Sequence, residues 1–368
     1  MGTRLLKQLI FNFQYLVLMV KNTMSHKTSF FNLTLSDLEQ NIALMGGRPA
    51  GAKSLFKTIY RENGNLVDAE KDISKTTYKH FQQNFSFTPC PIIKQHKSVD
   101  GSHKFLTAVG PHSSVESVLI PSKQRWTLCL SSQVGCAMEC SFCHTAKQGL
   151  SKNLTVAEIL SQYINARTLL REGQKITNIV FMGQGEPLHN FKNLSAAIDI
   201  LSSDFGIGLG KNSISVSTVG IVPMIDKLAL SSKVNLAVSL HSGFNEVRDI
   251  IAPINIQYPI EELLEACERY VKIRNGKILF EYVMLAGIND SQQDIERLAQ
   301  IIKPSIGKIN LIPFNPHTGS QYKCPSMEKM RDFQNSLSDR GLVTTLRETK
   351  GRDIMAACGQ LNSKMGLK

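Results

Sequence analysis

The chain has 368 residues, of which 42% are hydrophobic and 20% charged, a composition that excludes a disordered or fibrous protein. This length exceeds that of one small domain and favours a large catalytic domain with an accessory module. The formal net charge of +12 favours a polyanionic partner such as nucleic acid, although a solvated basic surface gives the same charge.

An apolar run lies between Lys7 and Lys21. It is shorter than the ~20 residues that a membrane-crossing helix needs, and polar residues interrupt it, so we expect no membrane association. No small-residue cleavage site follows, which argues against a secretory signal. Residues 1–23 are then either the product of a start codon assigned too early, with translation beginning at Met24, or an organellar transit peptide. We favour the first, which predicts a cytoplasmic protein; the second predicts the matrix of an organelle.

Helical spacing recurs over residues 34–46, 51–62 and 73–84 and predicts a small helical accessory domain over residues 24–90. Two strand-like runs then flank Asp100 and Gly101, the strongest short hairpin signal, and an alternating segment follows them. We therefore predict a β-hairpin and strand extension over residues 91–121.

Apolar strand runs alternate with amphipathic segments from residue 122 to residue 361. The runs are "RWTLCLSS", "ITNIVFM", "NSISVST", "VNLAVSL", "KILFEYVML" and "KINLIPF". This alternation predicts an α/β domain with a parallel sheet, followed by a tail over residues 362–368. The active site is expected in the loops at the carboxyl ends of the strands.

Three of the eight cysteines, Cys136, Cys140 and Cys143, lie in the loop after the first of these strands. Three thiolates so spaced can hold three irons of a four-iron cluster and leave the fourth iron open. A structural zinc site needs a fourth ligand, and His144 is the candidate, but adjacent residues seldom reach one metal together. Clustered cysteines in a large chain also indicate metal or redox chemistry in a reducing compartment.

This spacing resembles the radical S-adenosylmethionine superfamily, whose cysteine loop follows the first strand of a partial (β/α)6 TIM-type barrel. The resemblance implies a [4Fe-4S] cluster on the three cysteines, which cleaves S-adenosylmethionine to methionine and a deoxyadenosyl radical. The segment "MGQGEP" after the second strand is similar to the superfamily's glycine-rich stretch, where Glu186 would meet the amino group of the cofactor.

Further blocks, in the same order, resemble the RlmN and Cfr group of RNA methyltransferases and extend from about residue 115 to residue 361. They include "TLCLSSQVGC", "FMGQGEPLHN", "VSTVGIVP", "AVSLHS", "EYVMLAGIND", "NLIPFNPHTGSQY" and "GRDIMAACGQL". The sequences of these blocks are closer to RlmN than to Cfr, which implies methylation of carbon 2 of adenosine; the alternative is carbon 8.

The resemblance also implies the catalytic residues. Cys358 would accept a methyl group from one S-adenosylmethionine, a radical from a second would remove hydrogen from that methyl, and the methylene carbon would add to adenine. Cys129 would then form a disulfide with Cys358 and release the product, with Glu116 as the base. Without the resemblance, both thiols look like core residues and Glu116 like a solvent-facing side chain.

The positions that match the group's cofactor-binding residues are Gly185, Glu186, Ser217, Ser239, Leu240, His241 and Asn315. Two positions depart from the group's usual pattern. Gln184 stands where methionine is more common, and His144 stands where small residues are frequent. Both departures concern cofactor packing and substrate preference and leave the reaction class unchanged.

The implied substrates are 23S rRNA and tRNA next to the anticodon, with the accessory domain over residues 24–90 binding the RNA. An electron donor such as flavodoxin or ferredoxin and a monomeric state are further expectations. Two other functions would explain the cysteine loop: an activase that installs a radical in a partner protein, which needs neither Cys129 nor Cys358, and a non-catalytic RNA-binding protein with structural zinc.

Overall fold

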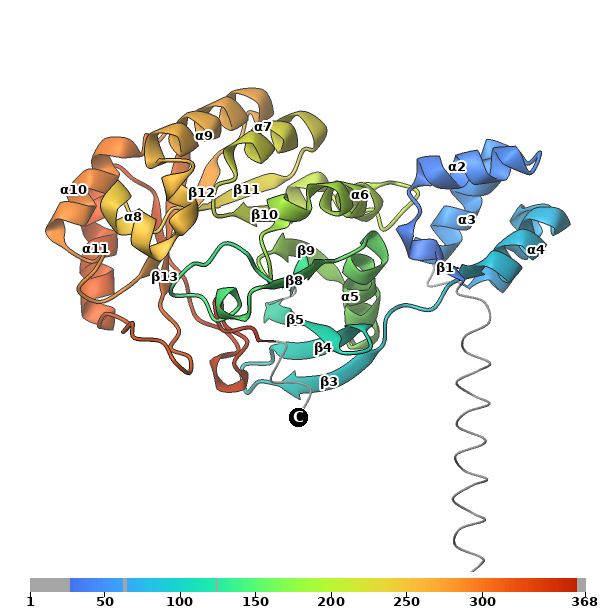
Figure 1. The fold of residues 1–368 in the computed structure, drawn as a ribbon, viewed down its shortest axis with the longest axis horizontal. Helices are drawn as coiled ribbons and strands as arrows, with labels where there is room; N and C mark the ends of the chain where they lie inside the picture. Colours follow the sequence, from blue (N-terminus) through green and yellow to red (C-terminus); the bar gives the residue numbers. More distant parts are fainter. Residues whose placement is uncertain (1–26, 62–64, 124, 363–368) are drawn as a thin grey trace, which may run out of the picture. The chain divides into compact units, whose positions relative to one another are not determined.

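The computed structural model describes residues 27–61, 65–123 and 125–362 (Figure 1). The chain divides into two compact units, Met1–Thr88 and Pro89–Lys368. The apolar run over residues 1–23 and residues 363–368 of the tail lie outside the described residues. Within the described parts of the chain, no helix has the length and apolar character needed to cross a bilayer.

Over residues 27–61 and 65–88 of the first unit, the structure describes three α-helices where the spacing predicts them: α2 (Leu35–Leu44), α3 (Pro49–Arg61) and α4 (Lys75–Asn84). The Thr34 side chain begins α2 by accepting a hydrogen bond from the Asp37 N–H, and the Asp37 carboxylate accepts one in return. A short parallel pair, β1 (Thr28–Ser29) and β2 (Phe85–Ser86), joins the two ends of the part of this unit that the structure describes. The helices enclose an aromatic core that includes Phe30, Tyr60 and Phe81.

The second unit contains the predicted partial (β/α)6 barrel, and the predicted fold class is confirmed. Its parallel strands are β6 (Arg125–Cys129), β9 (Ile176–Phe181), β10 (Ile214–Thr218), β11 (Asn235–Ser239), β12 (Ile278–Met284), β13 (Gly307–Pro313) and β14 (Thr344–Leu346). The first six correspond to the six predicted runs. The seventh, β14, is only three residues long and leaves no periodic signal in the sequence.

Helices lie between successive parallel strands, as a parallel sheet requires. They are α5 (Val156–Thr168), α6 (Phe191–Ser202), α7 (Val222–Ser231), α8 (Asn245–Ile251), α9 (Ile260–Arg274), α10 (Gln292–Ile301) and α11 (Met327–Asp339). They cover the outer face of the sheet (Figure 1). The loops that follow the carboxyl ends of the strands therefore remain available for the site.

Antiparallel strands extend the same sheet beyond β6. They are β3 (Ile92–Lys97), β4 (His103–Gly110) and β5 (Ser113–Ser122), and β5 pairs directly with β6, so the hairpin region continues the barrel sheet. The predicted turn lies between β3 and β4, where Gly101 adopts a left-handed φ of +85°.

Candidate active site

A small antiparallel pair holds the cysteine loop at its base. β7 (Gln133–Gly135) precedes the three cysteines and β8 (Leu150–Asn153) follows them. At this base the two chain segments come so close that a Cβ on residue 135 would collide with the carbonyl oxygen of Gly149, which explains why residue 135 is glycine. The cysteine loop therefore projects from the paired strands β7 and β8, which fix its two ends.

Cys136, Cys140 and Cys143 line one cavity, and all three are free thiols. Burial raises the pKa of each thiol, to about 12 for Cys136. Buried thiolates at this position therefore need a positively charged partner. Among the described residues no group of three His, Cys, Asp or Glu side chains is placed around one metal ion. A four-iron cluster binds each thiolate through a different iron, so it does not require the three sulfurs to converge. The donor set fits such a cluster.

The glycine-rich loop after β9 lines the same cavity with Gly185 and Glu186. Gly185 has a φ of +98°, and a Cβ there would lie 2.5 Å from the Cβ of Gln133. The Glu186 carboxylate accepts hydrogen bonds from the N–H groups of Leu188 (3.0 Å) and Val219 (2.9 Å). Burial nevertheless raises the pKa of Glu186 to about 7.

Residues at the ends of β10 and β11 complete the wall. Ser217, Ser239 and His241 line the cavity, and Leu240 contributes backbone hydrogen bonds from behind it. The Val283 N–H donates to Nδ1 of His241 (3.1 Å), so the neutral ring carries its proton on Nε2. Burial lowers the pKa of His241 to about 3, which keeps the ring neutral at physiological pH.

A second cavity adjoins the first and brings together the two cysteines that are distant in sequence. It is lined by Cys129, Asn315, Arg347, Lys350 and Cys358, among others. Cys358 lines both cavities, and its carbonyl oxygen accepts a hydrogen bond from the Asn315 amide (3.3 Å). Burial raises the pKa of Cys129 to about 12, whereas the nearby Cys358 thiol raises the pKa of Arg347.

Glu116 lines neither cavity, although it is buried. Its carboxylate forms an ion pair with Lys104 (2.9 Å) and accepts a hydrogen bond from the Asn362 N–H (2.7 Å). Glu116 therefore does not face solvent, which is the alternative that the strand pattern alone suggests, because β5 lies between β4 and β6 and most of its residues are buried. Burial raises the pKa of Glu116, and Lys104 opposes that rise.

The hairpin between β3 and β4 also holds the segment that carries Cys358. The Asp100 carboxylate accepts a hydrogen bond from the Gly351 N–H (2.7 Å), and the Asp353 carboxylate accepts one from the Val99 N–H (3.1 Å). The Lys104 ammonium donates to the Met355 carbonyl (3.1 Å). The methyl-accepting position predicted from the sequence is thus fixed to the edge of the sheet.

The two departures from the usual pattern have structural partners. The side-chain oxygen of Gln184 accepts the N–H of Glu116 (2.9 Å), a bond that methionine does not make in this way. The ring of His144 stacks on that of His317, with centroids 4.7 Å apart, and its Nε2 lies 2.9 Å from the Asn362 amide. Gln184 thereby connects the glycine-rich loop with β5, and His144 connects the cysteine loop with the C-terminal segment.

Sequence reasoning missed Glu281, Arg347 and Lys104. Glu281 lines the first cavity and accepts a hydrogen bond from the Ser217 hydroxyl (2.8 Å). Its position inside the apolar run "KILFEYVML" was an available signal, because charged residues are rarely buried without a partner. Arg347 and Lys104 carry no comparable signal in the sequence.

Comparison with known proteins adds three findings. Residues 130–300 match the model of the Radical SAM superfamily. The chain is 42% identical over 335 residues to the dual-specificity RNA methyltransferase RlmN of Bdellovibrio bacteriovorus, a match that covers 91% of this chain and 84% of that protein. The structure is similar, with a TM-score of 0.84 and 38% identity, to a radical SAM methyltransferase from Sphaerobacter thermophilus, covering 91% of this chain and 99% of that one.

Proposed function

The chain belongs to the RlmN family of radical S-adenosylmethionine RNA methyltransferases, and from this premise we propose that it methylates carbon 2 of adenosine in 23S rRNA and in tRNA next to the anticodon. One observation carries the proposal. Cys358 lines both the cavity of the three clustered cysteines and the cavity that contains Cys129. A methyl group on Cys358 is therefore accessible from the cofactor side, and its sulfur from the side of a second thiol.

The first cavity supplies the binding groups. Cys136, Cys140 and Cys143 would hold the [4Fe-4S] cluster, which when bound supplies the electron that cleaves S-adenosylmethionine. Glu186 would bind the amino group of the cofactor. Ser217, Ser239 and His241 supply neutral hydrogen-bonding groups on the same wall. Leu240 supports this wall through its backbone, and Asn315 orients the Cys358 backbone.

Cys358 carries the methyl group in this mechanism. Its thiolate takes the methyl of one S-adenosylmethionine, so that a new S–C bond replaces the sulfonium S–C bond and S-adenosylhomocysteine leaves. Cys358 would hold the methyl carbon where the radical chemistry of a second S-adenosylmethionine can remove one hydrogen atom from it, and this carbon would then bond to carbon 2 of adenine. Two molecules of S-adenosylmethionine are consumed per turnover, and Cys358 is transiently bonded to the RNA.

Cys129 and Glu116 complete the reaction. Restoring the aromatic ring would require the loss of one electron and of the carbon-2 proton. Glu116 would accept the proton, and the electron would return to the cluster on Cys136, Cys140 and Cys143, which the cleavage of S-adenosylmethionine leaves oxidised. Cys129 then attacks the sulfur of Cys358, the S–C bond to the RNA breaks, and a disulfide forms while the released carbon takes up a proton. Glu116 is held beside the segment that carries Cys358, and burial raises the pKa of this carboxyl group, which suits a proton acceptor.

We extend the proposal to the partners. The helical unit up to Thr88 binds the RNA, a flavodoxin or ferredoxin supplies the electrons, and the protein acts as a monomer in the cytoplasm. The net charge of +12 supports a polyanionic substrate, because lysine and arginine side chains neutralise phosphates.

Mass spectrometry of anaerobically purified protein tests the mechanism. We expect a methyl group on Cys358 in the wild type and none in the Cys136→Ala variant, with Cys90→Ala as a methylated control. Digestion of treated RNA should release 2-methyladenosine. Release of 8-methyladenosine would overturn the assigned carbon. Cleavage of S-adenosylmethionine with an unmodified Cys358 would overturn the methyl-carrier role and favour an activase.

A further inference from the structure

Arg248 of α8 is fully buried, with 0% of its surface exposed. Its guanidinium makes four hydrogen bonds: to the carbonyl oxygens of Val219 (2.5 Å), Ser239 (3.2 Å) and Leu240 (2.9 Å) and to the side-chain oxygen of Asn255 (2.8 Å). All four acceptors are neutral. In the described part of the chain no carboxylate forms an ion pair with Arg248. A buried charge with neutral partners is costly and calls for an explanation.

The helix that carries Arg248 packs on the cysteine loop. The carbonyl oxygen of Ile251, at the end of α8, accepts a hydrogen bond from the N–H of Ser141 (3.1 Å), the residue directly after Cys140. Ile251 and Ala252 also belong to a hydrophobic cluster against which Cys140 packs. Arg248 therefore lies one helical turn from the contact with the predicted cluster ligands.

The acceptors of Arg248 belong to the cofactor wall. Val219 and Ser239 line the first cavity, and they follow or end the neighbouring strands β10 and β11. The Val219 N–H donates to Glu186, so one residue connects Arg248 to the glycine-rich loop. A single guanidinium thus ties together the carboxyl ends of two strands and the acidic residue proposed to bind the cofactor.

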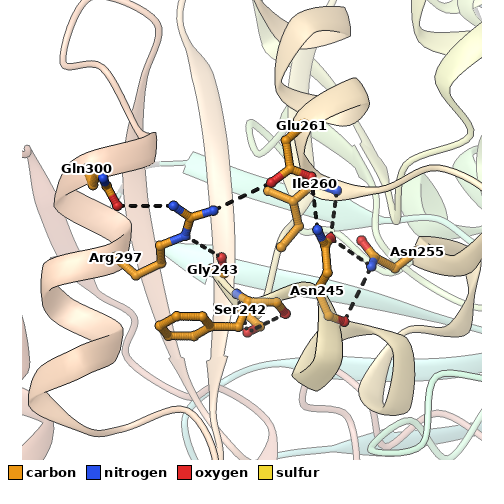
Figure 2. A network of polar contacts seen from close by, with 9 residues as sticks. Ser242, Gly243, Asn245, Asn255, Ile260, Glu261, Arg297 and Gln300 are labelled. Carbon is orange, nitrogen blue, oxygen red and sulfur yellow. Dashed lines mark hydrogen bonds and ion pairs between the residues drawn. The ribbon is translucent and has the colours of Figure 1, made fainter.

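Asn255, the neutral side chain that accepts a hydrogen bond from Arg248, belongs to a polar network with Asn245, Glu261 and Arg297 (Figure 2). The Asn255 amide donates to the side-chain oxygens of Asn245 (3.0 Å) and Asp249 (2.6 Å), so its own oxygen points to Arg248. The Asn245 amide in turn donates to Glu261 (2.9 Å), which is paired with Arg297 (3.5 Å). The carboxylates of this network lie beyond Asn255, and neither of them forms an ion pair with Arg248.

We propose that Arg248 is a positioning residue that fixes the carboxyl ends of β10 and β11 for the cofactor and that its charge raises the reduction potential of the iron–sulfur cluster. The inference rests on the cluster proposed above. Reduction adds one negative charge to the cluster, and a nearby buried cation stabilises the reduced form because the protein interior screens charge weakly. In agreement, burial lowers the pKa of Arg248 to about 10, and the Cys140 thiol opposes this lowering more than any other acidic group.

A redox titration of the full-length protein with a reconstituted cluster tests the inference, using dithionite, viologen mediators and the electron paramagnetic resonance signal of the reduced cluster. Arg248→Met should shift the midpoint potential to a more negative value. Arg248→Lys, which keeps the charge, should restore it towards the wild-type value. Arg269→Met, which removes an exposed arginine paired with Asp226 on α7, is the matched control and should cause no shift.

A charge-relocating variant covers the case in which Arg248→Met does not fold. Asp249→Asn combined with Asn255→Asp moves one negative charge next to the guanidinium without changing the net charge, at the cost of the hydrogen bond from Asn255 to Asn245. This double variant should also shift the midpoint to a more negative value. Wild-type midpoints in the folded variants that carry the wild-type iron content would overturn the inference. Absence of bound iron from the reconstituted wild type would instead overturn the proposed function.

Discussion

Cys129, on strand β6, and Cys358, in the C-terminal segment, line the same cavity, although most of the barrel separates them in the sequence. Cys358 alone of the two also lines the cavity of the clustered cysteines. The geometry therefore assigns different partners to the two thiols: Cys358 faces both the cofactor cavity and Cys129, and Cys129 faces only the second cavity.

Cys129→Ala should trap the reaction at the protein–RNA stage, because the bond between Cys358 and the RNA would then have no thiol to break it. We expect labelled RNA to migrate with the protein on a denaturing gel and the release of methylated RNA to fall at least a hundredfold. Cys90→Ala, at a half-buried cysteine that lines neither cavity, is the control. Release of methylated RNA at the wild-type rate would contradict the role of Cys129.

Glu186→Gln should change how stability depends on pH. Burial raises the pKa of Glu186 from 4.5 to about 7, so between these values the folded protein binds a proton more tightly than the unfolded chain. The contribution of Glu186 to stability is then fully present below the unfolded pKa and is lost as the pH rises through about 7. Glutamine does not ionise and avoids this loss.

Thermal unfolding of the cofactor-free protein at several pH values measures the effect. Relative to the wild type, Glu186→Gln should gain about 2 kcal/mol of unfolding free energy between about pH 5 and about pH 8. Glu261→Gln, at a largely exposed carboxylate, serves as the control. Parallel stability curves for the wild type and Glu186→Gln would show that Glu186 is ionised throughout this range.

Lys104→Met should destabilise the protein by about 3 kcal/mol, because it leaves the buried Glu116 carboxylate without its ion-pair partner. The same change removes the hydrogen bond to the Met355 carbonyl, so limited proteolysis should cut the segment after Gly351 sooner. The control is Lys303→Met, which breaks an exposed pair with Glu268 and should cost less than about 1 kcal/mol. Equal losses in the two variants would count against a buried ion pair.

Gly185→Ala should weaken binding of S-adenosylmethionine at least tenfold. The added Cβ would meet the Gln133 side chain at 2.5 Å, and the φ of +98° is strained for any residue with a Cβ. Isothermal titration of the reconstituted protein measures the effect. Gly276→Ala is a matched control, because a Cβ at that position meets nothing within 4 Å. Unchanged affinity of the Gly185→Ala variant for S-adenosylmethionine would contradict the prediction, because the glycine-rich loop would then accommodate the added Cβ without loss of binding.

Much of the barrel was predictable because buried parallel strands leave long apolar runs, and the cysteine loop was predictable because its chemistry requires a fixed spacing. The ion pair of Lys104 with Glu116 was not, since it depends on the register between β4 and β5. The proximity of Cys129 and Cys358 could be predicted only from the family resemblance, because it depends on how the C-terminal segment packs against the sheet. β14 was missed because three residues carry no periodicity.

The turn between β3 and β4 has a consequence for the evolution of the family. Surface turns ordinarily tolerate insertions and deletions, because little depends on their length. Here the backbone at Val99 and the carboxylate of Asp100 hold the segment that presents Cys358. A lengthened turn would displace the reactive sulfur, so relatives that keep the activity should show a constant number of residues between these two strands.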